Sequence, residues 1–179
     1  MPERSSISAF VLAGGLSTRM GQDKASLDWH GTTLLAHMIK ILSTEFSPIR
    51  IVGRGDLPDR LPGLGPLGGI ATAIGAAETD KSLIVAVDLP LLTPEFLKLF
   101  KTRIQTSPKP VVACKIGAAY PLCLGISRES LDLINQRISN QHLSVHGFIE
   151  AADCEIVTGI DPSIFANVNT PEDWQRIHF

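Results

Sequence analysis

The sequence predicts an α/β fold with a doubly wound sheet and helices on both of its faces. Short runs of β-branched and aliphatic residues alternate with segments of helical periodicity, and the first of these runs leads directly into a glycine-rich loop. The run at residues 83–87 is apolar at every position, which is typical of a central parallel strand that is covered on both sides. Sheets of this kind bind ligands beyond the carboxyl ends of their strands, so we expect the functional residues at that edge.

Strand and helix signals follow one another in order along the chain. Hydroxyl residues before an apolar periodic segment predict helix starts, and proline favours the first turn. The first half is predicted to contain a strand at residues 7–12, a helix that Thr32 or Thr33 caps, a strand at 49–52, a helix from Pro66 and the strand at 83–87. The second half is predicted to contain a helix that Thr93 caps, strands at 111–114 and 122–126, helices at 128–138 and 141–151, a strand at 155–157 and a last helix after Thr170.

The composition is that of one ordinary globular domain. With 179 residues, 44% of them hydrophobic, the chain can bury a core without staples, and we predict a disordered N-terminus at residues 1–6 and a single domain at residues 7–179. The formal net charge of -2 indicates no polyanion-binding surface, so nucleic acid is not an expected partner. The three cysteines lack CxxC spacing, and the sequence has no signal-peptide pattern or long apolar run. We therefore expect a reducing, cytoplasmic environment and no membrane insertion.

Residues 12–24 combine three glycines with two cations directly after the first predicted strand. Glycines let backbone N–H groups approach phosphate oxygens closely, and Arg19 and Lys24 can neutralise the charge on those oxygens. The segment is not a Walker A loop, because Gly15 and Gly21 are one residue too far apart and no Gly-Lys-Ser/Thr follows. We interpret it as a phosphate-binding loop; the alternative is a flexible surface turn.

The segment at residues 63–68 matches the dinucleotide-binding pattern G-x-G-x-x-G, and Asp88 follows about twenty residues later. That pattern requires a strand that ends at the first glycine, whereas residues 54–62 are charged and contain two prolines. We therefore favour a turn and a helix start that offer backbone N–H groups to a nucleotide base or sugar. The residues of this predicted contact are Gly65, Pro66, Leu67 and Gly68.

Acidic and amide residues beyond the predicted strands are candidates for metal and ligand binding. Asp88 directly follows the buried strand, where a hard carboxylate could hold Mg²⁺ while triphosphate oxygens complete its coordination. The alternative for Asp88 is a turn-capping role. Asp59 or Asp56 could contact the nucleotide or the metal, or could be ordinary solvated loop acids. Asn167 and Asn169 lie on one side of an extended segment before a helix start, which suits them to orient a ligand.

Five motifs resemble, in this order, those of the molybdenum cofactor guanylyltransferase family over residues 7–176. They are Leu12-Ala13-Gly14-Gly15, Arg19-Met20-Gly21 with Lys24, Gly65-Pro66-Leu67-Gly68-Gly69, Asp88-Leu89-Pro90 and Asn167-Val168-Asn169-Thr170-Pro171. The resemblance implies a Rossmann-like three-layer α/β/α sandwich with a mostly parallel, mixed central sheet, which forms a single nucleotidyltransferase domain. It also implies Mg²⁺-dependent transfer of GMP from GTP to the terminal phosphate of molybdopterin or molybdenum-molybdopterin, with release of pyrophosphate. Molybdoenzyme assembly proteins would be further partners.

The residues of this site follow from the motifs. Catalytic roles are expected for Arg19, Lys24 and Asp88, with Asp88 as the metal ligand, and acceptor binding is expected at Asn167 and Asn169. The predicted nucleotide-binding residues are Leu12, Ala13, Gly14, Gly15, Lys24, Asp59, Gly65, Pro66, Leu67, Gly68 and Asp88.

The chain departs from the pattern of the family it resembles at two places. Gly53-Arg54 follows the second strand, where the family usually has an asparagine near the nucleotide, and residues 140–151 contain no arginine or lysine where a basic segment is expected. The resemblance also implies guanine rather than cytosine, because related cytidylyltransferases have a first loop more like Leu-Ala-Ala-Gly, whereas this chain has Gly14-Gly15 and the Gly-Pro-Leu-Gly turn. Three alternatives stay open: CTP as the nucleotide, another phosphorylated acceptor, and a catalytically silent nucleotide-binding module that delivers cofactor. The two cations and the carboxylate argue against the last of these.

Overall fold

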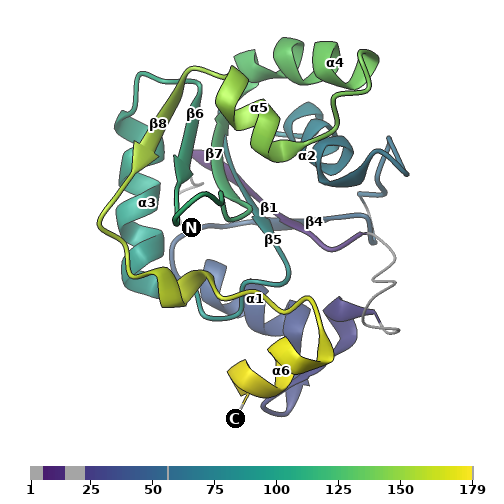
Figure 1. Cartoon of the computed structure of the whole chain (residues 1–179), viewed down its shortest axis with the longest axis vertical. Coiled ribbons are helices and arrows are strands. Elements are labelled where there is room, and N and C mark those ends of the chain that lie inside the picture. Colours follow the sequence, from purple (N-terminus) through teal and green to yellow (C-terminus); the bar gives the residue numbers. More distant parts are fainter. Residues whose placement is uncertain (1–5, 15–22, 56, 179) are drawn as a thin grey trace.

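The structure, a computed structural model of the chain, describes residues 6–14, 23–55 and 57–178. In these residues a six-stranded mixed sheet has the strand order β4-β1-β5-β7-β6-β8 (Figure 1). Its strands are β1 (Ile7–Leu12), β4 (Ile49–Val52), β5 (Lys81–Ala86), β6 (Val111–Cys114), β7 (Cys123–Ser127) and β8 (Cys154–Val157). β1 pairs in parallel with β4 and β5, and β6 pairs in parallel with β8, whereas β7 runs antiparallel to both β5 and β6. The expected mostly parallel, mixed sheet is therefore confirmed.

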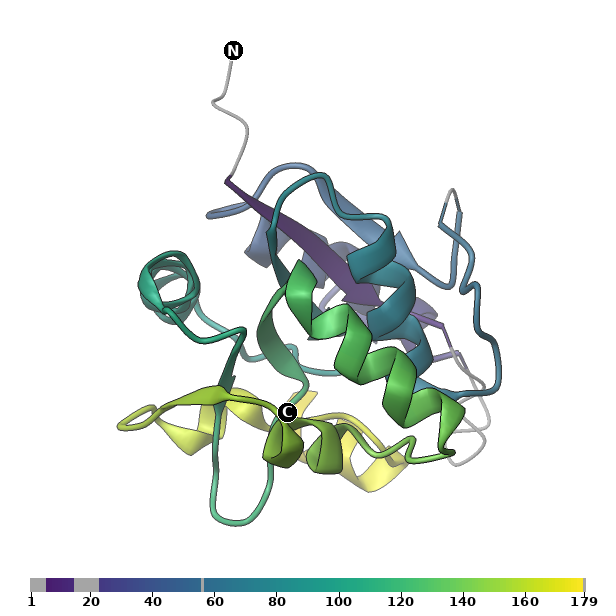
Figure 2. The same cartoon turned by 90° about the horizontal axis from the view of Figure 1, so that it is seen from above.

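Helices cover both faces of the sheet, so that the molecule has three layers (Figure 1, Figure 2). One face carries α1 (Leu34–Leu42), α3 (Pro94–Thr106) and α6 (Pro171–His178), and the other carries α2 (Gly65–Gly75), α4 (Leu131–Ser139) and α5 (Val145–Ala151). The side chains of β1 alternate between the faces: Ile7, Ala9 and Val11 belong to the core cluster of α1 and α3, whereas Phe10 belongs to that of α2 and α4. The three-layer α/β/α sandwich is confirmed.

Hydroxyl side chains begin two of the helices as predicted. Thr33 Oγ1 accepts a hydrogen bond from the amide of Ala36 (3.1 Å), and Thr93 Oγ1 accepts one from the amide of Phe96 (3.2 Å). Helix α2 begins one residue before Pro66, so the proline lies in the first turn, where its missing N–H removes no helical hydrogen bond. These local signals for helix starts are confirmed.

The helix predicted at residues 141–151 is wrong in its first turn. Helix α5 begins only at Val145, because Ser144 caps it there and Gln141 has a left-handed backbone (φ 59°) that a helix cannot continue. His142 instead lies just after α4, where its amide donates a hydrogen bond back to Arg137 O (2.8 Å) and closes the end of that helix.

A hairpin that the sequence analysis did not predict precedes α1. It consists of β2 (Asp28–Trp29) and β3 (Thr32–Thr33), and both of its turn residues, His30 and Gly31, have positive φ (49° and 84°). The hairpin places Trp29 in the core, where it is 4% exposed and its ring lies 5.6 Å from that of Trp174 on α6. Through Trp29, the hairpin therefore packs against the last helix, α6.

The cysteines lie in or next to the sheet. Cys114 and Cys123 are fully buried, and Cys154 is half-buried. Burial raises the pKa of Cys114 to about 12 and that of Cys154 to about 11, and it raises the pKa of Cys123 well above its ordinary value. These thiols are therefore protonated at neutral pH, and Cys114 and Cys123 pack in the core.

The N-terminus and the membrane question concern the chain as a whole. Apart from Ser6, the predicted disordered N-terminus lies outside the described residues, and the assignment of residues 7–179 to a single domain stays a prediction. In the parts of the chain that the structure describes, no helix is long and apolar enough to cross a lipid bilayer. The cytoplasmic location stays a prediction.

The parallel strands point in one direction, so their carboxyl ends meet at one edge of the sheet. The strand ends at this edge are Leu12, Val52, Ala86, Cys114 and Val157. Hydrogen bonds continue beyond them: the amide of Ala13 donates to Val52 O and the amide of Val87 donates to Leu12 O, both at 3.1 Å. The residues that follow β1 and β5 are thus held firmly where a ligand would bind.

Candidate active site

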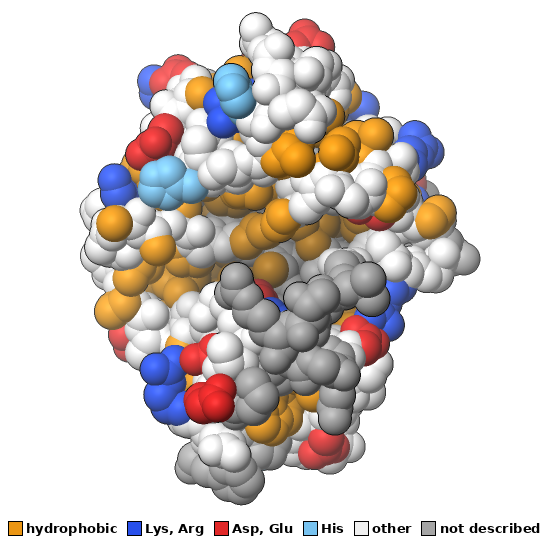
Figure 3. Space-filling model, turned by 45° about the vertical axis from the view of Figure 1, so that its right-hand side comes forward, with side chains coloured by type: hydrophobic (Ala, Val, Ile, Leu, Met, Phe, Trp, Pro, Cys, Tyr) orange, Lys and Arg blue, Asp and Glu red, His pale blue; other side chains and the backbone are white. Residues whose placement is uncertain are grey.

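A cleft of about 1360 Å³ opens along the carboxyl edge of the sheet (Figure 3). Its lining comes from the ends of β1 and β4, the residues after β5, the start of α2, the connection between β6 and β7 and the segment before α6. Figure 3 shows hydrophobic side chains along the interior of this hollow. Single small-molecule sites occupy roughly 300–1,000 Å³, so the cleft has room for two ligands at once.

Three polar side chains from distant parts of the sequence meet in the cleft. Lys24 Nζ lies 3.0 Å from Asp88 Oδ2 and 2.5 Å from Asn169 Oδ1. Only 17% of the Lys24 side chain and 18% of the Asp88 side chain are exposed, so water screens this ion pair weakly. The structure thus brings together a predicted phosphate-binding cation, the predicted metal ligand and one of the two predicted acceptor-binding amides.

Backbone contacts fix the segment that carries Asn169. The amide of Val168 donates a hydrogen bond to Asp88 O (3.0 Å), and the amides of Asn169 and Thr170 both donate to Asp173 Oδ2 (3.1 and 3.0 Å). The hydroxyl of Thr170 in turn accepts from the amide of Asp173 (3.1 Å). Burial raises the pKa of Asp173, but these hydrogen bonds outweigh it and hold the pKa below its ordinary value. The carboxylate therefore stays ionised and keeps the start of α6 in place.

The backbone after β1 and the backbone after β4 touch at two glycines. Gly53 has a φ of 88°, and a Cβ atom at this position would lie 2.5 Å from Gly14 Cα. Leu12, Ala13 and Gly14 all line the cleft. Because Gly53 has no room for a side chain and a Cβ atom on Gly14 would lie only 3.1 Å from Gly53 Cα, the backbone itself forms the wall here. Gly15 and Arg19, the other predicted residues of the glycine-rich loop, lie outside the described residues.

Arg54 lines the cleft as well, although the sequence analysis did not assign it to the site. Its Nε donates a hydrogen bond to Ala13 O (2.9 Å), and its guanidinium forms an ion pair with Asp23, which also lines the cleft. The signal available in the sequence was a cation directly after a predicted strand at the ligand-binding edge. The contacts of Arg54 with Ala13 and Asp23 could not be predicted from the sequence, because these residues lie 41 and 31 residues earlier in the chain.

The start of α2 places two of its four predicted nucleotide-binding residues at the cleft. Gly65 and Pro66 line it, whereas Leu67 is fully buried in the core. Gly68 packs against Leu61, whose carbonyl oxygen would lie 2.7 Å from a Cβ atom at position 68. The turn of the helix directs Leu67 and Gly68 toward the protein interior, away from the cleft.

Asp59 lies in the cleft wall beside α2 and is half-buried. Its Oδ1 accepts hydrogen bonds from the amide of Leu61 (2.9 Å) and from the hydroxyl of Thr72 (3.1 Å). Asp59 therefore attaches the loop to the helix, and a contact with the nucleotide stays a prediction. Asp56 lies outside the described residues.

The connection between β6 and β7 lines the other end of the cleft and contains Tyr120, which the sequence analysis did not place in the site. Lys115 Nζ lies 5.2 Å from the centre of the Tyr120 ring, and the ring of His146 meets it edge-on at 4.9 Å between centres. Asn167 is exposed and lines the cleft from the segment before α6. The connection between β6 and β7 thus gives the cleft an aromatic ring with a cation beside it.

The sequence profile of the MobA-like NTP transferase domain family matches residues 9–153, which is well over half of the chain. The chain belongs to this family. The family expected from the five motifs is therefore confirmed.

Relatives of this MobA-like domain match it along nearly their whole length. The molybdenum cofactor guanylyltransferase of Xanthomonas euvesicatoria is 36% identical and covers 93% of this chain and 92% of the relative. A Carboxydothermus hydrogenoformans protein named "Probable molybdenum cofactor guanylyltransferase" is 32% identical, with 93% and 92% covered. The solved structure of molybdopterin-guanine dinucleotide biosynthesis protein A from Archaeoglobus fulgidus has a TM-score of 0.79 at 19% identity, covering 96% of this chain and 97% of that chain. This last similarity shows a shared fold.

The arrangement in this MobA-like domain suits the handling of phosphates. A weakly screened ammonium and a carboxylate lie side by side, and glycine backbone forms the neighbouring wall. Oxygen atoms of Asp88 and Asn169 both contact Lys24 Nζ, so they face the same point in the cleft. The site can therefore offer a hard oxygen ligand to a metal ion and positive charge to an anionic substrate.

Proposed function

We propose that the protein transfers GMP from GTP to the terminal phosphate of molybdopterin or molybdenum-molybdopterin, forming molybdopterin guanine dinucleotide and releasing pyrophosphate. The observation that carries this proposal is the contact of Lys24 Nζ with Asp88 Oδ2 at 3.0 Å inside a cleft large enough for two substrates. Membership of the family and the names of relatives that are more than 30% identical support the same activity. The fold supports it because the cleft lies beyond the strand ends.

The nucleotide is proposed to occupy the end of the cleft near β1, β4 and α2. Glycine backbone approaches the phosphates there, and the start of α2 adds the positive end of a helix dipole near Gly65 and Pro66. Arg19 and Gly15 are proposed to act in the same place, on the strength of the motif alone.

Mg²⁺ fits the chemistry of Asp88, because its carboxylate is a hard oxygen ligand that lines the cleft and has a second oxygen besides Oδ2, which contacts Lys24 Nζ. When bound, the ion supplies positive charge to the phosphate oxygens. Lys24 adds a fixed charge beside it. This charge matters because two anions must meet: unit charges 4 Å apart repel by about 4 kcal/mol at an effective dielectric constant near 20.

The acceptor is proposed to enter from the end that Tyr120 lines and to contact Asn167. A terminal phosphate oxygen of the acceptor attacks the α-phosphorus of GTP, a new P–O bond forms, and the bond to the β-phosphate oxygen breaks with departure of pyrophosphate. The attacking phosphate is already ionised at neutral pH, so the chain needs no strong general base. Positioning and charge neutralisation are the tasks left to its residues.

Mass spectrometry of the products tests this proposal. The purified protein is incubated with Mg²⁺, molybdopterin and either GTP or CTP, and pyrophosphate is measured in parallel. We expect molybdopterin guanine dinucleotide from GTP, and its loss in Lys24→Ala. Dinucleotide formed only from CTP, or only with a different phosphorylated acceptor, would contradict the substrates proposed. Binding of GTP without pyrophosphate release would show a cofactor-delivery module instead.

A further inference from the structure

Arg54 contacts both segments that flank residues 15–22. Its Nε donates to Ala13 O (2.9 Å), just after β1, and its guanidinium pairs with Asp23, just before the short 3₁₀ helix η1 (Lys24–Ser26). The planar guanidinium presents several N–H donors in a fixed arrangement, so one side chain can hold both partners at once. An arginine at this position therefore restrains two points of the chain relative to each other.

Asp23 passes this restraint on to η1. Its Oδ1 accepts from the amide of Ala25 (3.3 Å) and its Oδ2 accepts from the hydroxyl of Ser26 (2.5 Å), so it is the N-cap of η1. Burial raises the pKa of Asp23, but the hydrogen bond from Ser26 and the charge of Arg54 outweigh it and hold the pKa below its ordinary value. The carboxylate is therefore ionised whenever the protein is near neutral pH.

Lys24 is the first residue of η1, and its ammonium reaches Asp88 and Asn169. The other anchor of η1 is Ala25, which is 3% exposed and packs in the core with α1. The core therefore holds η1 on one side and Asp23 holds it on the other. Loss of the Asp23 contact would leave the buried alanine as a pivot and would let the Lys24 stem rotate.

We propose that Arg54 is a positioning residue: by holding Asp23 and the Ala13 carbonyl together, it sets the place of the Lys24 ammonium at the nucleotide phosphates. This inference rests on the proposed function for the binding of a nucleotide, and not on the identity of the acceptor. The ion pair itself stabilises the fold little, because the Arg54 and Asp23 side chains are 37% and 39% exposed. A positioning role therefore predicts a large effect on binding with a small effect on stability.

The experiment measures the affinity of a fluorescent GTP analogue in the presence of Mg²⁺ and without acceptor. We expect Arg54→Ala to raise Kd by about tenfold, because the misplacement of one charged group costs that much or more, and to shift Tm by less than about 3 °C. Arg54→Lys should fall between the wild type and Arg54→Ala, since an ammonium can pair with Asp23 but cannot hold the fork geometry. Asp23→Asn should resemble Arg54→Ala.

A double-mutant cycle with Lys24→Ala distinguishes positioning from direct contact. If Arg54 acts through Lys24, Arg54→Ala changes Kd by less than about twofold in the Lys24→Ala background. If Arg54 touches the phosphates itself, the two effects are additive, and that result overturns the proposal. Equal affinity of wild type and Arg54→Ala would also overturn it, while leaving the proposed function standing. Failure of the wild type to bind the analogue would overturn both.

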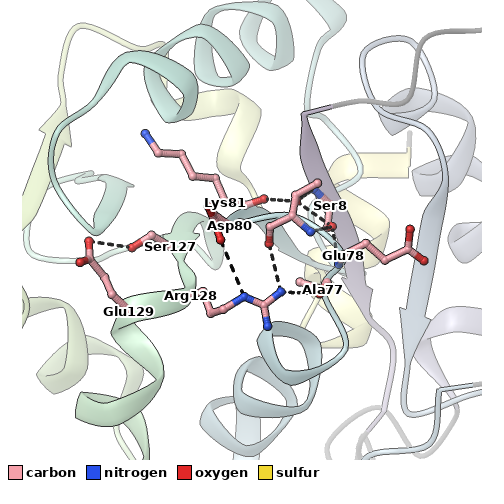
Figure 4. Close-up of polar contacts among 9 residues, drawn as sticks. Ser8, Ala77, Glu78, Asp80, Lys81, Ser127, Arg128 and Glu129 are labelled. Carbon is pink, nitrogen blue, oxygen red and sulfur yellow. Dashed lines mark hydrogen bonds and ion pairs between the residues drawn. The ribbon is translucent and has the colours of Figure 1, made fainter.

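Arg128→Ala is the matched control, because Arg128 makes similar contacts at the opposite edge of the sheet (Figure 4). Its guanidinium donates to Ala77 O (2.6 Å) and Thr79 O (3.5 Å) and lies 4.0 Å from Asp80. This arginine joins the end of α2 to the start of β5, far from the cleft. We expect its loss to lower Tm by more than Arg54→Ala does and to leave Kd for the analogue unchanged.

Discussion

Replacement of Asp88 by asparagine tests the centre of the site with little change in shape. The Asp88 carboxylate lies 3.0 Å from Lys24 Nζ, and two unit charges at this distance attract by about 5 kcal/mol at an effective dielectric constant near 20. The variant leaves the Lys24 ammonium without its counter-charge, which costs about 3–5 kcal/mol in a fully buried pair. Both side chains here keep some exposure (17% and 18%), so we expect a loss of unfolding free energy at the lower end of that range. An asparagine oxygen can still accept a hydrogen bond from the lysine, which limits the loss further.

The effect on catalysis should be larger, because the amide lacks the negative charge that we propose binds Mg²⁺. We expect kcat/KM to fall about a thousandfold, which corresponds to about 4 kcal/mol of transition-state stabilisation. The assay is the initial rate of pyrophosphate release over a titration of Mg²⁺, with thermal unfolding measured on the same sample. Asp80→Asn serves as the control, since its side chain is 96% exposed at the other edge of the sheet. A near-normal rate for Asp88→Asn at every Mg²⁺ concentration would refute the metal assignment.

Three further predictions concern other parts of the molecule. Gly53→Ala should destabilise the fold by about 1–3 kcal/mol and weaken GTP binding, because φ is 88° and the new Cβ would lie 2.5 Å from Gly14 Cα; an unchanged urea midpoint would contradict this. Tyr120→Ala should raise KM for molybdopterin about tenfold and leave KM for GTP unchanged, whereas Tyr120→Phe should be nearly normal; equal changes in both KM values would count against an acceptor site at this end. The raised pKa of Cys114, about 12, means that the unfolded thiol ionises first as pH rises. This thiol should therefore lower the unfolding free energy above about pH 8.5 by up to about 1.4 kcal/mol per pH unit, in addition to what Cys123 and Cys154 contribute. Cys114→Ala should lose that part of the slope, and an unchanged slope would refute the assignment.

Local chemistry was sufficient to predict where most elements begin. Thr33 and Thr93 cap helices because a hydroxyl before an apolar periodic segment satisfies free amides within three residues. The helix at 141–151 was misplaced because Ser144 offered a competing cap and Gln141 adopted a backbone that its residue type seldom takes. The hairpin before α1 was not predicted, because a two-residue turn that contains a histidine is a weak sequence signal for a hairpin.

The residues of the candidate site also fall into those that the sequence predicts and those that depend on tertiary contacts. Lys24, Asp88 and Asn169 carried motif signals, and the order of strands and helices was enough to expect them at one edge of the sheet. Arg54 and Tyr120 carried no signal of that kind, because each depends on neighbours brought in by another segment. The glycine at position 53 is explained only by the approach of Gly14, which a linear pattern cannot show.

The sequence by itself determined the alternation of strands and helices, the faces they bury and the family to which the chain belongs, since these follow from periodicity, local hydrogen bonding and ordered motifs. The tertiary structure alone decided the reversed direction of β7, the contact of Gly14 with Gly53 and the attachment of Arg54 to Ala13 and Asp23. Those features join residues that are far apart in the chain, and their free energy comes from packing and charge pairs that exist only once the sheet has formed.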